Sequence, residues 1–210
     1  MAGAHGATTP MALQAALAVL LHHLGAGEDV LIGATIAGRT DEALADMVGF
    51  FVNTWVLRAD LSGAPTFEQV LAQVRGRALE AYENQDVPFD LLVEALNPER
   101  STARHPVFQV MFTWQSEDRI TLDLPGVSAS LEAVPTGTAK FDMELNFAHD
   151  SGTGNLRCVL EYATDLFDRE TVERFAARFL SLVEALTACP ARPVGVVDVL
   201  LPAERSRWAR

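Results

Sequence analysis

Hydrophobic patterns of helical and extended type alternate along this chain, and their order limits the folds that it can adopt. Residues 29–36 (DVLIGATI) are a short apolar run rich in β-branched side chains, which is typical of a buried strand. Apolar residues at helical spacing precede this run, from Met11 to Leu24. Further strands are expected at 49–58, 106–114, 141–149 and 155–162, and further helices at 66–84, 89–96 and 168–188. This succession predicts an α/β fold of the layered α+β kind, with a mixed sheet flanked by helices.

Local signals mark where several of these elements begin and end. Thr9-Pro10 is expected to cap and start the first helix, and Gly25 to end it in a left-handed conformation. Thr66 and Gln69 have the spacing of a capping box. Less regular segments are expected at 1–7 (disordered or foreign to the domain), 37–48 (a loop with at most one helical turn), 115–139 (two weak strand signals) and 194–200 (short and extended).

The composition is that of a globular protein that does not bind polyanions. Hydrophobic residues make up 49% of the 210 residues and charged residues 21%, which excludes an intrinsically disordered chain. The net charge of −12 opposes binding to nucleic acids or to anionic membranes. Cys158 and Cys189, the only cysteines, make neither a disulfide framework nor a zinc site. No signal peptide or membrane-spanning run is visible, so we expect a cytoplasmic protein without a bound metal.

Common catalytic motifs are absent from the sequence. It contains no G-x-x-x-x-G-K-[ST], no G-x-G-x-x-G after a strand and no G-x-S-x-G. The pair His22-His23 begins the sequence HHLGAGE, which departs from the acyltransferase motif H-H-x-x-x-D-G because Gly27 and Glu28 replace its Asp and Gly. Histidines near a helix C-terminus complement the helix dipole, so the pair is assigned to a helix surface.

Three segments are hard to explain by folding alone. Residues 48–54 (VGFFVNT) place Asn53 and Thr54 in an apolar strand, which is costly unless both are hydrogen-bonded. Residues 84–90 (NQDVPFD) are a polar run between two helices, in which Asp86 could also be an N-cap. Residues 100–109 (RSTARHPVFQ) lead into a strand, where Arg104 could be an ordinary strand-entry charge.

In this order, the three segments resemble the late core motifs of the condensation domains of nonribosomal peptide synthetases. They match the family patterns V-G-x-F-V-N-T…R, H/N-Q-D-x-P-F-E and R-D-x-S-R-N/H-P-L, with Asp90 in place of Glu and with Thr102-Ala103 departing from the third pattern. The flanking sequence agrees over residues 7–205, and LPAER at 201–205 resembles the linker to an adenylation domain.

The resemblance implies that the chain is the C-terminal half of a chloramphenicol-acetyltransferase-like pair. Residues 8–200 would be this subdomain and 201–210 the start of the linker. The H-H-x-x-x-D-G motif belongs to the N-terminal half, so this chain would hold no catalytic residue and be inactive alone. It would form part of the tunnel where a donor thioester and an acceptor amine are joined by a peptide bond. Phosphopantetheine would arrive on the carrier proteins, and no cofactor would bind directly.

The resemblance also assigns roles to particular residues. Residues that would line the tunnel or brace the cleft are Phe51, Asn53, Thr54, Gln85, Asp86, Arg104 and His105. For Asn53 a purely structural buried hydrogen bond is the alternative, and for Gln85 and Asp86 a loop-and-cap role. Arg104 would form an ion pair between the two halves, or be only a charge at the strand entry.

The same resemblance names partners and rival functions. The partners would be the N-terminal half of the domain, the donor and acceptor peptidyl carrier proteins and a downstream adenylation domain. Residues 37–49 would floor the cleft, and 115–139 would be a latch onto the other half. Without that half, the latch should be mobile or pack on a second copy, giving a homodimer. The rival functions are a non-catalytic module that docks carrier proteins or tailoring enzymes, and part of an epimerisation domain.

Overall fold

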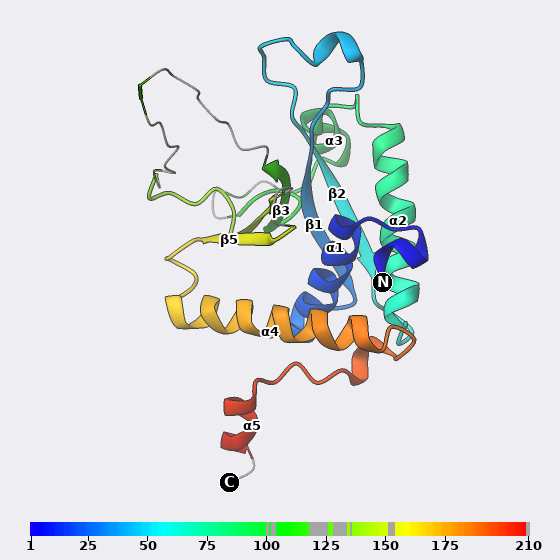
Figure 1. Ribbon diagram of the computed structural model, residues 1–210, viewed down its shortest axis with the longest axis vertical. Helices are drawn as coiled ribbons and strands as arrows, with labels where there is room; N and C mark the ends of the chain where they lie inside the picture. Colours follow the sequence, from blue (N-terminus) through cyan, green and yellow to red (C-terminus); the bar gives the residue numbers. More distant parts are fainter. Residues whose placement is uncertain are drawn as a thin grey trace.

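A five-stranded mixed sheet forms the centre of the protein, seen here in a computed structural model (Figure 1). The structure describes residues 1–99, 101, 104–117, 126–127, 134, 136–150 and 154–208. In chain order the strands are β1 (Asp29–Ile36), β2 (Asn53–Asp60), β3 (Val110–Glu117), β4 (Met143–Asp150) and β5 (Leu156–Tyr162). Their order across the sheet is β2-β1-β3-β4-β5, which confirms the predicted layered α/β fold with a mixed sheet.

The pairing of the strands makes the sheet mixed. β1 and β2 are antiparallel over their full length, from Asp29 opposite Asp60 to Ile36 opposite Asn53. β3 lies parallel to both β1 and β4, and β5 returns antiparallel to β4. The hairpin predicted from residues 141–162 is therefore confirmed as β4 and β5.

Helices supply the rest of the core. They are α1 (Thr9–Leu21), α2 (Phe67–Glu83), α3 (Phe89–Leu96), α4 (Arg169–Ala188) and α5 (Pro202–Trp208). α1 is buried on nearly every side, because it packs against α2, α4 and β1. An apolar surface all round is the pattern of a central core helix. α2 and α4 bury only one face each, through residues such as Phe67 and Phe179.

Several predicted helix ends are confirmed. The capping box of Thr66 and Gln69 begins α2, and Asp168 begins α4 by accepting a hydrogen bond from the Thr171 N–H at 2.7 Å. Gly25 turns the chain after α1 with a φ of 98°. The cap of α1 is Thr8 rather than Thr9, because the Thr8 hydroxyl accepts the Met11 N–H.

The strand predictions for 49–58 and 106–114 begin too early. β2 begins at Asn53 because its partner strand β1 ends at Ile36, so earlier residues have no ladder to join. β3 begins at Val110, opposite Ile32, and Pro106 has no N–H to give to a ladder. Residues 194–200, predicted to be extended throughout, instead contain the 3-10 turn Val194–Val196. The Val194 N–H donates to the Pro65 carbonyl at 2.8 Å.

The N-terminal residues are attached to the fold. Residues 1–7, predicted to be disordered or foreign, contain the 3-10 helix Ala2–His5, and Arg75 donates to the Gly6 carbonyl at 2.8 Å. Ala7 is buried against the core.

Residues 37–48 contain one short turn, Glu42–Leu44, as predicted. Most of the predicted latch at 115–139 lies outside the described residues.

Two further features follow from the described parts of the chain. In those parts, no helix combines the length and the apolar character needed to cross a membrane. The same residues include no group of three or more histidine, cysteine or acidic side chains that could hold a metal ion.

Candidate functional site

The three segments singled out from the sequence meet at one place in the fold. Asn53 stands at the first position of β2, where the strand emerges from the 37–52 loop. Its side chain contacts the 84–90 segment, and that segment leads into α3. Phe89 of α3 then stacks on His105, which belongs to the third segment. Asn53 therefore contacts residues more than 30 positions later in the chain, and Phe89 connects them to the third segment.

Asn53 is fully hydrogen-bonded within the chain. Its Nδ2 donates to the carbonyls of Gln85 at 3.0 Å and Val87 at 2.7 Å. Its Oδ1 accepts the backbone N–H groups of Thr54 at 2.9 Å and Phe89 at 3.2 Å. An asparagine amide has two donors and two acceptor positions, so none remains for a ligand. These contacts give Asn53 a structural role, in which it joins the start of β2 to the 84–90 segment.

The contacts that hold the 84–90 segment come from its backbone and from Gln85 rather than from the Asp86 carboxylate. Gln85 donates from Nε2 to the Tyr82 carbonyl at 2.8 Å, and its own carbonyl accepts from Asn53. Asp86 is exposed and does not cap α3, whose N-cap is Pro88 with no side-chain cap bond. Asn53 takes over the capping role, because its Oδ1 accepts the N–H of the first helical residue.

His105 lies among aromatic rings. Its ring centroid is 5.7 Å from that of Phe89, 4.2 Å from that of Phe108 and 5.3 Å from that of Phe141. His105 Nδ1 is buried and has no hydrogen-bond partner among the described residues. Burial lowers the pKa of His105 below its ordinary value, and a backbone contact with Phe108 opposes this only in part. The neutral imidazole is therefore favoured, and it acts here as a fourth ring of the cluster.

Gly33 connects this aromatic cluster to the sheet. Phe108 is almost completely buried and lies directly on Gly33 of β1. A Cβ atom at position 33 would stand 2.2 Å from Phe108 Cε2, so only glycine leaves room for the ring. Asp142 follows Phe141 in the chain, and burial raises the pKa of its carboxyl group.

Arg39 organises the 37–52 loop and was not recognised as important from the sequence. Its guanidinium donates to the carbonyls of Leu44 and Met47, the latter at 3.0 Å. The same group lies over the Phe51 ring, with Cζ 4.4 Å from the centroid. Gly38 permits this approach, because it has a φ of 65° and a Cβ there would meet the Phe51 carbonyl. Every residue has a backbone carbonyl, so the partners of such an arginine cannot be recognised from residue types, and the sequence offered no signal for Arg39.

Several apolar side chains of this loop are exposed to solvent. Val48 and Phe50 are 102% and 89% exposed. Met47 and Val52 are also exposed. In Figure 1 the loop projects from the end of β1 and β2, at the opposite end of the molecule from α5. A preorganised loop that displays apolar side chains is a feature of surfaces that contact another protein.

The remaining predicted site residues bring no side chain to the hydrogen-bond cluster, which Thr54 joins only through its backbone N–H. Thr54 lies beside Asn53 and pairs with Thr35 across the ladder. Arg104 is exposed and forms no ion pair with any described residue, so the structure leaves both alternatives for it open. The Phe51 ring lies under the Arg39 guanidinium.

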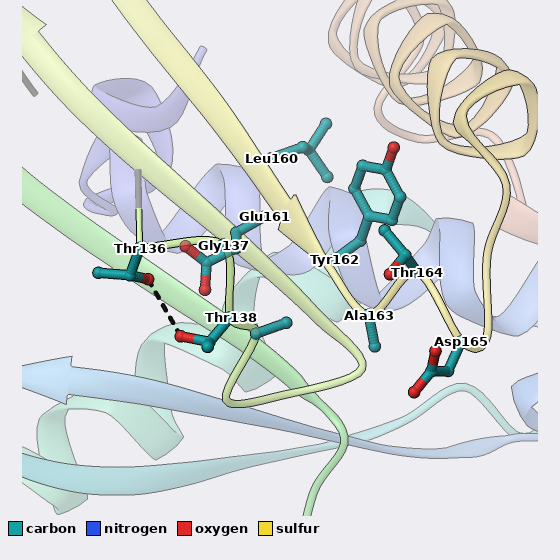
Figure 2. Close-up of a pocket in the computed structure, with 10 residues that line it drawn as sticks. Thr136, Gly137, Thr138, Leu160, Glu161, Tyr162, Ala163, Thr164 and Asp165 are labelled. Atoms are coloured by element: carbon teal, nitrogen blue, oxygen red, sulfur yellow. Dashed lines mark hydrogen bonds between the residues drawn. The ribbon is translucent and has the colours of Figure 1, made fainter. Parts of the chain in front are cut away.

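A separate cavity of about 560 Å³ lies beside the end of β5. Residues 136–139 form one wall, and β5 with the following turn to Asp165 forms the other, as Figure 2 shows. Thr136 and Thr138 are hydrogen-bonded through their hydroxyls at 3.0 Å. None of the residues predicted to line the tunnel borders this cavity.

Comparisons with known proteins place the chain in a family. The family model described as the condensation domain matches residues 1–207. The chain is 49% identical to CymA, a nonribosomal peptide synthetase of Salinispora arenicola, over 100% of this chain and 3% of that protein. It is also 49% identical to a dimodular nonribosomal peptide synthase of Bacillus subtilis, over 93% of this chain and 8% of that protein.

Solved structures agree with this assignment. The X-domain from teicoplanin biosynthesis superposes with a TM-score of 0.86 and 34% identity, over 94% of this chain and 45% of that chain. The X-domain has also been solved as a complex with OxyB, where the TM-score is 0.81, the identity 35% and the coverage 93% of this chain and 43% of that chain. The chain thus spans under a tenth of those two synthetases and under half of the solved X-domain. It belongs to the condensation-domain family of nonribosomal peptide synthetases.

Proposed function

We propose that this chain is the C-terminal half of a condensation domain. The observation that carries the proposal is the match itself, which covers nearly all of this chain but 45% of a solved domain of the family. The 210 residues also lack the H-H-x-x-x-D-G motif that the family resemblance assigns to the other half. The exposed Val48 and Phe50 support a contact between the 37–52 loop and that half.

In the complete domain, this half would form one wall of the tunnel. The acceptor amine attacks the donor thioester carbonyl, a C–N bond forms, the C–S bond breaks and the phosphopantetheine thiol leaves with a proton. A general base or a positioning group is needed for the amine. His105 is poorly suited to that role, because it lies among aromatic rings and burial lowers its pKa, which makes it a weaker base than an ordinary histidine. The contribution of this half is to shape the tunnel that brings the two arms together.

A complementation assay tests this proposal. Two carrier proteins loaded with a donor aminoacyl group and an acceptor amino acid are incubated with the chain alone, and peptide bond formation is followed by mass spectrometry. No product is expected. The chain fused behind the N-terminal half of the condensation domain from the B. subtilis relative is expected to form product, and the same fusion with the second motif histidine replaced is the control. Product from the chain alone would contradict the proposal.

A docking module is the second candidate function. It is favoured by the likeness to the X-domain, which has been solved in complex with OxyB. In that case the partner would be a tailoring enzyme or a carrier protein, and no chemistry would take place on this chain. Isothermal titration of the chain with loaded carrier proteins and with a tailoring enzyme separates the two functions. Tight binding by the chain alone, together with an inactive fusion, would favour the docking module.

A further inference from the structure

The C-terminal helix α5 contributes no buried apolar side chain among its described side chains, residues 202–206. The core ends with Val197, which is buried, and Val199, which packs against it. Beyond these, none of the described side chains of α5 is buried. A helix of seven residues does not hold its conformation or position by itself in water. The described contacts that fix its position are polar.

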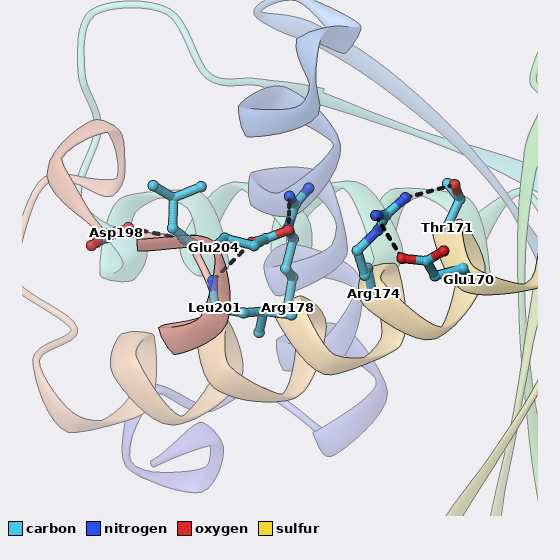
Figure 3. A network of polar contacts seen from close by, with 8 residues as sticks. Glu170, Thr171, Arg174, Arg178, Asp198, Leu201 and Glu204 are labelled. Carbon is cyan, nitrogen blue, oxygen red and sulfur yellow. Dashed lines mark hydrogen bonds and ion pairs between the residues drawn. The ribbon is translucent and has the colours of Figure 1, made fainter. Parts of the chain in front are cut away.

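One ion pair joins α5 to α4. Arg178 Nη2 donates to Glu204 Oε1 at 2.6 Å, and Arg178 Nε donates to Glu204 Oε2 at 3.2 Å (Figure 3). The two side chains are only 23% and 17% exposed. A two-point contact of this kind, partly removed from water, is stronger and more directional than a surface pair.

Glu204 also shapes the helix that it anchors. Its Oε2 accepts the Leu201 N–H at 2.9 Å, which satisfies one of the free N–H groups at the start of α5. Asp198 supports the same turn, since it accepts the Leu200 N–H at 2.9 Å and pairs with Arg205 Nε at 3.0 Å. Glu204 thus connects the local structure of α5 with its position on α4.

Other ion pairs of α4 have a different character. Arg169 and Glu173 are 85% and 63% exposed, and they join residues one turn apart on the same helix. Arg174 pairs with Glu170 in the same way. Such exposed pairs contribute little to stability and fix no second element. They provide matched controls for the pair that links two helices.

We propose that Arg178 and Glu204 form a clamp that holds α5 on α4 and sets the direction in which the polypeptide continues. The exit lies at the end of the molecule opposite to the 37–52 loop (Figure 1). A domain attached after residue 210 in a longer chain would then be kept away from the surface assigned to the other half. Only this last step rests on the proposed function, and the clamp itself does not.

Hydrogen exchange measured by mass spectrometry tests the clamp in the whole chain. In Arg178→Gln, the amides of residues 201–208 are expected to exchange about tenfold faster, while those of α1 and β1 stay unchanged. Glu204→Gln should have the same effect, and Arg178→Lys a smaller one because a lysine makes no two-point contact. Arg169→Gln is the control and should leave α5 unchanged. The double variant Arg178→Gln/Glu204→Gln should exchange no faster than the faster single variant.

A fluorescent protein fused after residue 210 tests the second part of the proposal. Its rotation should be coupled to the domain in the unsubstituted chain and become faster in Arg178→Gln, as read from time-resolved anisotropy. Unchanged exchange of 201–208 in both Arg178→Gln and Glu204→Gln, or additive effects in the double variant, would overturn the clamp. An inactive condensation fusion with a working clamp would instead count against the proposed function alone.

Discussion

The Oδ1 atom of Asn53 accepts the N–H of Phe89 at 3.2 Å, and so an asparagine at the start of β2 caps the helix α3. Most N-caps come from the residue that directly precedes the helix. Here that residue is Pro88, which has no side-chain acceptor, and the cap comes from another element. This explains why an asparagine in the first motif occurs together with the polar segment of the second motif.

Replacement of Asn53 by alanine should destabilise the domain strongly. The substitution removes an amide group that makes four hydrogen bonds to the backbone, three of them partly buried. We expect the free energy of unfolding to fall by about 2–4 kcal/mol, measured by urea denaturation. Asn84→Ala is the control, because Asn84 is exposed and makes one bond to the Glu80 carbonyl at 2.8 Å. Equal effects of both substitutions would show that Asn53 does not hold the motifs together.

Replacement of Gly33 by alanine should also be destabilising, but through packing. The new methyl group would overlap the Phe108 ring and force it out of the aromatic cluster. We expect a loss of about 2–4 kcal/mol in the free energy of unfolding. Gly76→Ala, within α2, meets no atom within 4 Å and should stabilise the protein by about 0.5–1 kcal/mol. A neutral Gly33→Ala would mean that Phe108 can move without cost.

Elements whose signal is local could be predicted from the sequence. β1 and α3 have the predicted bounds, and the capping box of Thr66 and Gln69 begins α2 as expected. Strand starts were less accurate, because the first residue of β2 is decided by where its partner β1 ends. The β-forming residue types at 49–52 can be read from the sequence, but not the fact that these residues lie beyond the end of the β1–β2 ladder.

The candidate site could be located from the sequence but its contacts could not be derived. The three motifs do meet, and His105 and Asn53 are in the middle of the contacts. Their roles depend on partners that are distant in the sequence, such as Val87, 34 residues after Asn53. Arg39 was missed for the same reason, since its partners are carbonyl oxygens and one ring. Tertiary contacts of this kind leave no periodic pattern to recognise.

The burial of His105 predicts a pH dependence of stability. Its pKa is lowered below the ordinary value of 6.5 in the folded state, so the unfolded chain binds more protons as the pH falls below that value. The neutral histidine therefore favours folding above about pH 6.5, and this contribution is lost as the pH falls through the folded pKa. In His105→Phe, the free energy of unfolding should fall less steeply between pH 7 and pH 5, measured by urea denaturation at each pH.

A second histidine provides the control for this measurement. His22 is half-buried just after α1, bonds to the Gly27 carbonyl at 2.7 Å, and has its described ring contact with His23 rather than with the aromatic cluster. His22→Phe therefore controls for the general effect of replacing one histidine by phenylalanine outside the aromatic cluster. An unchanged slope in His105→Phe would mean that His105 is not held neutral by its aromatic neighbours.

The contacts of Arg39 predict that one side chain determines the order of the 37–52 loop. In Arg39→Ala the loop loses two bonds to carbonyls and the stack on Phe51, so its amides should exchange faster. In Arg39→Lys, the exchange rates of these amides should lie between those of the wild type and those of Arg39→Ala, because a lysine replaces the planar stack with a single point charge.

The same change should hardly affect the rest of the protein. Arg39 is exposed and outside the core, so the free energy of unfolding should change by less than about 1 kcal/mol. Arg58→Ala is the matched control, because Arg58 is an exposed arginine that makes two bonds to Asp29 outside the loop. It should leave exchange in 37–52 unchanged. Val48 and Phe50 can present a fixed surface to another protein only if the loop keeps its shape, so equal exchange in Arg39→Ala and the wild type would remove the structural basis for that contact.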